Sequence, residues 1–151
     1  MGAKPVLCDV YDDDKLRKAL RESRSDVLVD FLTDLPDLAR EVPEFAARTA
    51  RMWQEGTSKL VAAAQAARVG RLVSQSLAWK IPGEVGRATH DHERMILDAK
   101  GTLIRFGQLY GPGTYYESKQ PPPPRIHVDS AVRRAYGVLG ASEGIVTLVD
   151  E

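Results

Sequence analysis

The stretch LIRFGQLYGPGTYY, residues 103–116, decides the fold. It begins with a short apolar run that is typical of a buried strand, and Gly111-Pro112-Gly113 then ends the regular structure. Glycine has no side chain to keep the backbone away from a neighbouring group, and proline removes a backbone donor. The stretch therefore predicts a strand that leads into a loop lying close to another part of the molecule.

A second motif, Ile126-His127-Val128-Asp129, follows the first one downstream. Together with R-x-G-x-x-Y-G-P-G at residues 105–113, it resembles the late strand, the substrate loop and the I-H-V-D signature of the extended short-chain dehydrogenase–reductase family. That family includes nucleotide-sugar epimerases and dehydratases. The two motifs stand in the family's order, and the resemblance covers nearly the whole chain.

The resemblance implies an α/β fold, a partial Rossmann-like parallel sheet with flanking helices that lacks the first two strands and the Gly-rich turn. We expect one domain over residues 1–151, with a substrate loop at 107–125. Apolar runs predict the strands, which are Pro5–Cys8, 26–32, 71–76, 103–106 and 144–149. Helical spacing predicts the helices, which follow Asp14, run from Pro43 to Arg68 and from Ala88 to Leu97, and start at an N-cap on Asp129.

Composition excludes several classes of protein. The chain has 151 residues with 21 basic and 21 acidic side chains, so no basic excess indicates nucleic acid or an anionic membrane as a partner. No apolar run approaches the length that crosses a bilayer, and the N-terminus lacks the apolar stretch of a signal peptide. Cys8 is the single cysteine, so no disulfide can form within the chain. We expect a cytoplasmic protein.

The resemblance implies NAD or NADP as cofactor. In the family, an aspartate that closes the first of these strands contacts the adenine, and Asp9 matches it. Leu32 and Thr33 match the segment that passes the nicotinamide-side ribose. Only Gly2 precedes Gly56, so no Gly-rich turn can grip the pyrophosphate at a helix N-terminus. We hypothesise that the chain is an N-terminally truncated member of this family and that it binds NAD(P) weakly or not at all.

Catalytic residues are carried over from the family only in part. Ser76 matches the serine that hydrogen-bonds the reacting hydroxyl. The family's catalytic Tyr-x-x-x-Lys is absent, because no tyrosine lies between Ser76 and Lys100. An asparagine of the family's proton relay is replaced by Trp53. The histidines and acids at 90–93 do not have the i, i+4 spacing of a helical zinc site, so we predict no metal.

The substrate-binding prediction rests on the loop and its two flanking motifs. It names Arg105, Tyr110, Gly111 and His127 as contacts for a nucleotide-sugar-like small molecule. For Arg105, the alternative is an edge residue that extends its charge into water. Residues 121–124 are four prolines, which favour a stiff spacer over a ligand for a partner's aromatic groove.

Three functions remain open. The first is an NAD(P)-dependent epimerase/dehydratase-like domain, without activity if the Gly-rich loop and the Tyr/Lys pair are essential. The second is a nonenzymatic NAD(P)-binding regulatory relative. The third is an interaction protein, a homo-oligomer for example, that pairs through an exposed sheet edge.

Overall fold

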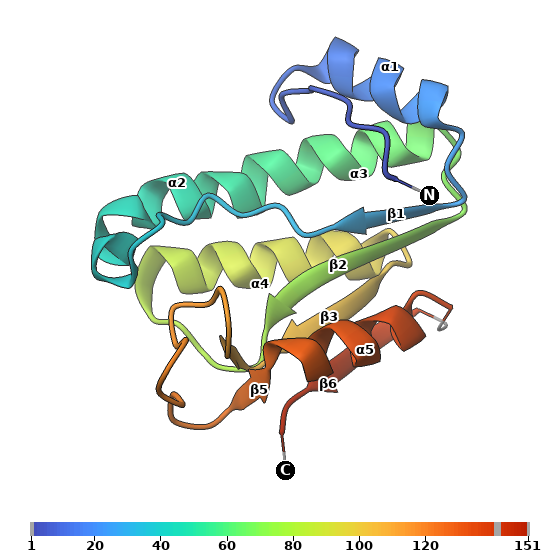
Figure 1. The fold of residues 1–151 in the computed structure, drawn as a ribbon. Coiled ribbons are helices and arrows are strands. Elements are labelled where there is room, and N and C mark those ends of the chain that lie inside the picture. The colour runs from blue at the N-terminus through green and yellow to red at the C-terminus, as the bar shows by residue number, and fades with distance from the viewer. Residues whose placement is uncertain (1, 141–142, 151) are drawn as a thin grey trace.

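The computed structural model describes residues 2–140 and 143–150. Its centre is a parallel sheet with the strand order β1-β2-β3-β6 (Figure 1). The strands are β1 (Val27–Asp30), β2 (Arg71–Leu77), β3 (Thr102–Phe106) and β6 (Gly144–Leu148). In the register, Val29 lies opposite Val73, and Ile104 lies opposite Val146. The predicted α/β class and parallel pairing are confirmed.

A second, smaller sheet is formed by the loop that follows β3. Its strands are β4 (Gln108–Tyr110) and β5 (Arg125–His127), and they run parallel. Their register places Tyr110 opposite His127. The two sequence motifs that carry the resemblance therefore lie side by side.

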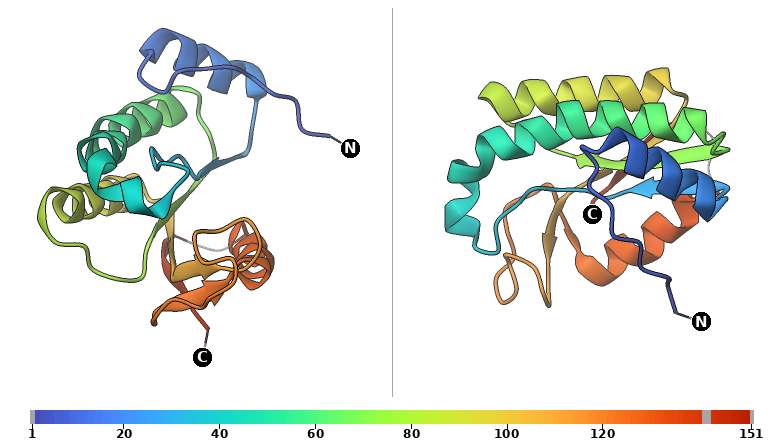
Figure 2. Two further views of the ribbon diagram at one scale, coloured as in Figure 1. Left: turned by 60° about the vertical axis from the view of Figure 1, so that its left-hand side comes forward. Right: turned by 90° about the horizontal axis from the view of Figure 1, so that it is seen from above.

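Helices cover both faces of the main sheet. The N-terminal helix is α1 (Asp13–Ser23), and α4 (Gly83–Asp98) packs against β2 and β3. Between them in sequence lie η1 (Ala39–Phe45), α2 (Ala46–Arg51), η2 (Met52–Gly56) and α3 (Thr57–Ala66). On the opposite face lies α5 (Val128–Val138), which packs against β3 and β6 (Figure 2).

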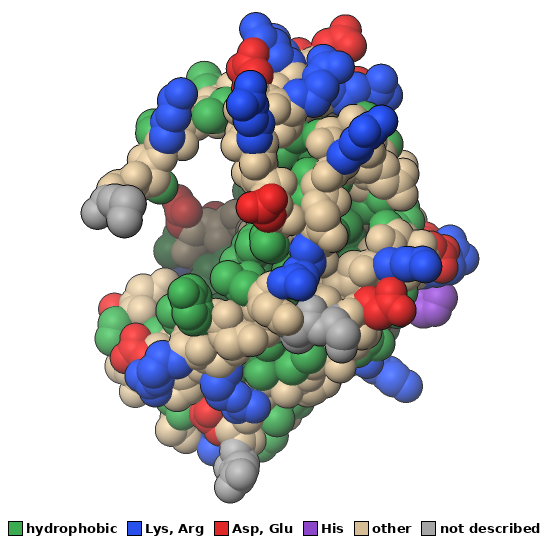
Figure 3. Space-filling view, turned by 90° about the vertical axis from the view of Figure 1, so that its right-hand side faces the viewer, with side chains coloured by type: hydrophobic (Ala, Val, Ile, Leu, Met, Phe, Trp, Pro, Cys, Tyr) green, Lys and Arg blue, Asp and Glu red, His purple; other side chains and the backbone are tan. Residues whose placement is uncertain are grey.

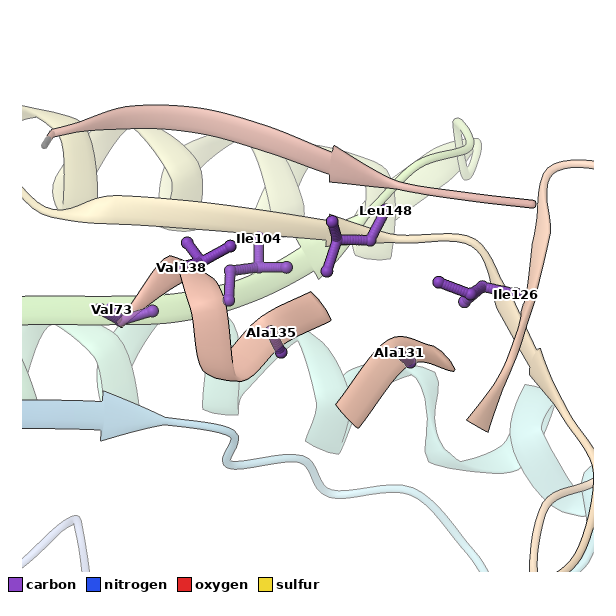
Figure 4. Packing of buried hydrophobic residues seen from close by; sticks show 7 residues of the cluster. All are labelled: Val73, Ile104, Ile126, Ala131, Ala135, Val138 and Leu148. Atoms are coloured by element: carbon purple, nitrogen blue, oxygen red, sulfur yellow. The ribbon is translucent and has the colours of Figure 1, made fainter. Parts of the chain in front are cut away.

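The largest apolar cluster lies between the sheet and α5 (Figure 4). Val73, Ile104 and Ile126 are fully buried there, and small side chains of α5, Ala131 and Ala135, let the helix approach the strands. Two central strands and β5 thus share one core, which fixes the substrate loop against the sheet.

The long predicted helix forms as one nearly continuous helix over residues 46–66. Met52–Gly56 is a π-helical turn within it, and such turns occur frequently at functional sites. A Cβ on Gly56 would lie 2.8 Å from the Met52 sulfur and 3.7 Å from Val10 Cγ1. The tight contact at Gly56 is therefore with the Met52 side chain one turn earlier, while Val10 of the N-terminal segment lies at an ordinary contact distance.

The prediction of a strand at Pro5–Cys8 is wrong. These residues form no strand, and Leu7 is 103% exposed. A strand needs a hydrogen-bonding neighbour, and within residues 2–140 and 143–150 none lies beside this segment. Its apolar pattern alone could not form one.

Two helix starts also differ from the prediction. The helix predicted from Ala88 begins earlier, at Gly83, so His90 and His92 lie in its middle rather than at its start. The N-cap of α5 is His127 and not Asp129, because His127 Nδ1 accepts a hydrogen bond from the Asp129 amide at 3.3 Å. Asp129 lies in the first turn, where its charge favours the helix dipole.

None of the helices in the described ranges is long and apolar enough to cross a membrane. Those ranges also contain no group of three or more histidine, cysteine or acidic side chains placed to hold a metal ion.

Candidate functional site

The carboxyl ends of parallel strands meet at one edge of a sheet, and open α/β sheets bind their ligands outside that edge. Here that edge gathers the ends of β1, β2 and β3. Leu32 and Thr33 follow β1, Ser76 and Leu77 end β2, and Phe106 ends β3. The candidate site is therefore this edge together with the substrate loop.

Ser76 and Arg105 both donate hydrogen bonds to the carboxylate of Glu93, which lies on α4. The Ser76 hydroxyl donates to Glu93 Oε1 at 2.5 Å, and Arg105 donates to both carboxylate oxygens at 2.7 and 2.6 Å. Burial opposes the ionisation of Glu93, but the hydrogen bonds from Arg105 and Ser76 outweigh it and lower the Glu93 pKa. Ser76 is 2% exposed, so its hydroxyl serves this ion pair and does not face open solvent.

A second buried network lies beside the first. His92 of α4 lies 2.7 Å from the Thr57 hydroxyl through Nδ1 and 2.9 Å from the Gln75 carbonyl through Nε2. The Ser74 hydroxyl donates to Asp30 Oδ2 at 2.8 Å, and it lies 3.2 Å from His92 Nε2. Side chains of β1, β2, α3 and α4 are thereby joined at the end of β1.

Burial lowers the pKa of His92, although the hydrogen bond to the Gln75 carbonyl and the charges of Asp30 and Glu93 oppose this. The imidazole is therefore neutral at pH 7. Neutral His92 can donate from Nε2 to the Gln75 carbonyl and accept from the Thr57 hydroxyl at Nδ1. Trp53 packs on the same ring, with ring centroids 4.8 Å apart.

The substrate loop brings three predicted residues together. The rings of Tyr110 and His127 pack edge to face at 5.2 Å, and a Cβ on Gly111 would lie 2.7 Å from His127 Nε2. Asp150 accepts from the Tyr110 hydroxyl at 2.8 Å and from the His127 amide at 3.2 Å. This hydrogen bond to Asp150 raises the pKa of Tyr110. Arg105 is not in this cluster, because it pairs with Glu93.

The substrate loop also contacts the segment that follows β1. The Tyr115 hydroxyl donates to the Pro36 carbonyl, and Phe31 packs edge to face on Phe106 with ring centroids 5.9 Å apart. The side-chain amide of Gln75 donates a hydrogen bond to the Leu32 carbonyl at 3.1 Å. Leu32 and Thr33 are both exposed. The predicted cofactor segment and substrate loop are thus neighbours at one edge.

Asp9 lies apart from these groups, in the exposed loop before α1. Its carboxylate accepts from the Tyr11 amide at 2.9 Å, which stabilises the local turn. The predicted adenine contact stays a prediction.

The cavity beside the networks is small. Asp30, Leu32, Trp53, Thr57 and His92 contribute to its lining, and its volume is about 10 Å³. A single water needs about that volume, so a nicotinamide ring does not fit inside. A dinucleotide would have to lie along the open carboxyl edge.

The described ranges contain no binding site for the pyrophosphate of such a dinucleotide. It requires a Gly-rich turn between a strand and a helix N-terminus, whose amides face the anion. Helix α1 instead starts at Asp12, Asp13 and Asp14, and α4 carries Glu84 in its first turn. These acids repel phosphate. The described residues therefore do not fit the pyrophosphate of NAD(P).

Sequence reasoning missed Glu93, His92 and Asp150 as members of the site. Helical spacing could have shown that His92 is buried, because it lies four residues before Ile96, and both are buried on one face of α4. No local pattern shows that Glu93 connects Ser76 with Arg105.

No protein-family model matches the chain. A 3-diazoavenalumate denitrifying reductase from a Streptomyces species is 36% identical to it over an alignment of 135 residues, and the match covers 74% of this chain and 44% of that protein. The chain thus spans less than half the length of this curated relative.

Solved structures with a similar fold include NAD complexes. The UDP-glucose 4-epimerase of Thermus thermophilus with NAD has a TM-score of 0.75 at 15% identity, over 94% of this chain and 62% of that one. The enzyme WbmH of Bordetella bronchiseptica with NAD+ has a TM-score of 0.76 at 14% identity, over 99% and 62%.

A hypothetical dTDP-4-dehydrorhamnose reductase from Sulfolobus tokodaii has a TM-score of 0.73 at 14% identity, over 99% of this chain and 66% of that one. These comparisons confirm the predicted resemblance to extended short-chain dehydrogenase–reductase enzymes, and NAD as a cofactor among the relatives. The chain has the Rossmann-like fold of the Thermus epimerase and of WbmH over 62% of the length of each.

Proposed function

We propose that this chain carries the nicotinamide-side edge and the substrate loop of an NAD(P)-dependent oxidoreductase of the epimerase/dehydratase type. The observation that carries the proposal is the 36% identity to a reductase in a chain whose sheet has the fold of NAD-bound epimerases. The contact between the segment after β1 and the substrate loop supports it, because cofactor and substrate must meet there.

The residues have separate roles in this proposal. Leu32 and Thr33 line the nicotinamide side, while Tyr110, Gly111 and His127 contact a nucleotide-sugar-like substrate. Bound NAD(P) would supply hydride chemistry, and the protein would orient the reactants. The Ser76 hydroxyl already donates a hydrogen bond to Glu93. In this proposal Ser76 therefore stabilises the carboxyl edge of the sheet and does not bind a substrate hydroxyl.

A second candidate is a nonenzymatic NAD(P)-binding regulatory relative. Helix α4 contains no tyrosine, and the Ser76 hydroxyl is already bonded to Glu93. General acid–base catalysis needs a proton-transferring group within hydrogen-bond reach of the substrate. The carboxyl edge could then bind a cofactor without turning over a substrate.

NADH titration followed by amide NMR tests the proposal. We expect weak binding, with shifts concentrated at Leu32, Thr33 and the end of β2. Thr33→Trp should block the site, whereas Thr147→Trp, at an exposed threonine of β6, should not. Shifts confined to the amino-terminal edge, around Arg71 and Lys100, would contradict it.

Turnover separates the two candidates. The chain is incubated with NAD and UDP-glucose, and the sugar nucleotides are then separated by chromatography and identified by mass spectrometry, because epimerisation and dehydration return the hydride and leave no net NADH. A new sugar nucleotide together with NADH binding supports the oxidoreductase, and binding with unchanged UDP-glucose supports the regulatory relative.

A further inference from the structure

The amino-terminal edge of the main sheet, opposite the candidate site, carries a larger cavity. Its volume is about 460 Å³, which lies in the range of about 300–1,000 Å³ for small-molecule sites. It is lined by α3 and the residues that follow it, by the residues after α4, by the starts of β2 and β3, and by Glu143. The proposed function makes no use of this amino-edge cavity.

Two closed helix ends hold the walls of the cavity in place. After α3 the Val69 amide donates to the Ala64 carbonyl at 3.0 Å, and after α4 the Gly101 amide donates to the Ile96 carbonyl at 2.9 Å. A Cβ on Gly101 would lie 2.8 Å from Ile96 Cγ2 and 3.1 Å from the Leu72 carbonyl oxygen. The turn after α4 is therefore packed directly against β2, and the cavity is formed before any ligand binds.

Part of the lining is apolar. Leu72 is 8% exposed and belongs to the buried cluster between the sheet and α4, and Val61 and Ala99 pack against that cluster. All three side chains also line the cavity. This apolar wall, Val61, Leu72 and Ala99, offers a surface for the apolar part of a ligand.

Charged side chains of both signs complete the lining. Lys100 and Arg71 are basic, and Glu143 directly precedes β6 on the same edge. Arg71 Nη1 donates to the Leu139 carbonyl at 2.7 Å, and a guanidinium has further N–H donors for a ligand. The strands of Figure 1 start on its right-hand side, which faces the viewer in Figure 3, and there basic and acidic side chains lie beside hydrophobic ones.

The helix ends add to the negative part of this charge pattern. Both α3 and α4 point their C-terminal ends at the cavity, and a helix C-terminus carries a partial negative charge that favours a cation. A ligand that is only an anion would be repelled by Glu143 and by these helix ends. A ligand that is only a cation would be repelled by Lys100 and Arg71.

We propose that the amino-edge cavity binds a small zwitterion, an α-amino acid with an apolar side chain. Its carboxylate pairs with Lys100 and Arg71, in charge-assisted hydrogen bonds. Its ammonium group lies toward Glu143 and the helix C-termini, and its side chain lies on the apolar wall. Such a ligand complements the charges of both signs and the apolar wall together.

Calorimetric titration of the full chain with L-phenylalanine and L-leucine tests this inference. We expect at least one of them to bind, and to bind at least about tenfold more tightly than three analogues that each lack one group. These are phenylpropionate without the ammonium group, phenethylamine without the carboxylate, and glycine without the apolar side chain. In amide NMR spectra, the shifts should centre on Leu72, Ala99 and Thr102.

Two pairs of variants locate the site. Gln65 and Ala62 are both exposed on α3, but only Gln65 lines the cavity, so Gln65→Trp should weaken binding at least about tenfold and Ala62→Trp should not. Lys100→Gln should also weaken it. Arg68→Gln is its control, because Arg68 follows α3 with φ +55° as Lys100 follows α4 with φ +58°, yet Arg68 is not part of the lining.

Absence of binding by both amino acids at millimolar concentration overturns the inference. Equal binding by any of the three analogues overturns it as well, as do equal effects of Gln65→Trp and Ala62→Trp or shifts centred on the carboxyl edge. The titrations with the ligand series use the unaltered chain, so they do not depend on how any variant folds.

Discussion

The imidazole of His92 lies between the helices and the sheet, 3% exposed, and burial keeps its pKa below that of histidine in an unfolded chain. Between the two pKa values the unfolded state binds more protons than the native state, so stability rises with pH there. The contribution of His92 is complete above the unfolded pKa of about 6.5 and is lost as pH falls toward the folded pKa.

We therefore predict that the melting temperature falls as the solution is acidified from about pH 7.5 to about pH 5. Each unit by which the pKa is lowered corresponds to about 1.4 kcal/mol. His92→Gln should flatten this dependence, whereas His90→Gln, at an exposed position of the same helix, should keep it. Thermal unfolding at a series of pH values measures the effect, and equal slopes for the two variants would contradict it.

The Glu93–Arg105 pair gives a second prediction at the scale of the residue. The two side chains are 13% and 35% exposed, so Glu93→Gln leaves a half-buried guanidinium without its counter-ion. We expect a loss of about 1–3 kcal/mol in the free energy of unfolding, less than for a fully buried pair. Glu55→Gln is the control, because the side chains of Arg51 and Glu55 are 57% and 43% exposed, so solvent screens their ion pair and its loss should be clearly smaller. Urea unfolding that gives equal losses would refute the prediction.

At the scale of the element, the substrate loop depends on two glycines in the left-handed region. Gly111 has φ +107° and Gly113 has φ +78°. A Cβ on Gly111 would lie 2.7 Å from His127 Nε2, whereas a Cβ on Gly113 would meet nothing within 4 Å. Both substitutions strain the backbone, but only the first displaces His127.

We predict that Gly111→Ala lowers the free energy of unfolding by about 1–2 kcal/mol more than Gly113→Ala does. His127 also caps α5, so the amides of its first turn should exchange faster in Gly111→Ala alone. Hydrogen exchange of α5 in the two variants checks this. Equal exchange would show that the loop does not depend on the contact with His127.

All four strands of the main sheet could be predicted from sequence, whereas the N-terminal segment outside the sheet could not. Val73 and Ile104 are fully buried, so apolar runs alone identify β2 and β3. Pro5–Cys8 has a similar apolar pattern but no neighbouring strand, and it remains extended without pairing. The site residue Glu93 was missed because its role depends on three elements meeting, which no local spacing encodes.

At the scale of the whole molecule, the two sides of the sheet differ in how they are covered. Helix α5 covers β3 and β6 around Ile126 and Leu148, while Val29 of β1 and Leu7 of the N-terminal arm, residues 2–8, are exposed. The candidate site lies on the carboxyl edge of this sheet, next to the open strand.

The arm gives a last prediction that follows from this asymmetry. Deleting residues 2–7 should change the free energy of unfolding of the chain alone by less than about 0.5 kcal/mol, because Leu7 is fully exposed. Deleting residues 2–10 should cost more, since Val10 is 9% exposed and packs with Leu16 and Leu60. Urea unfolding of the two deletion variants measures the difference. A large loss of stability on deleting residues 2–7 would contradict the prediction, because it would mean that the arm packs against the body of the molecule.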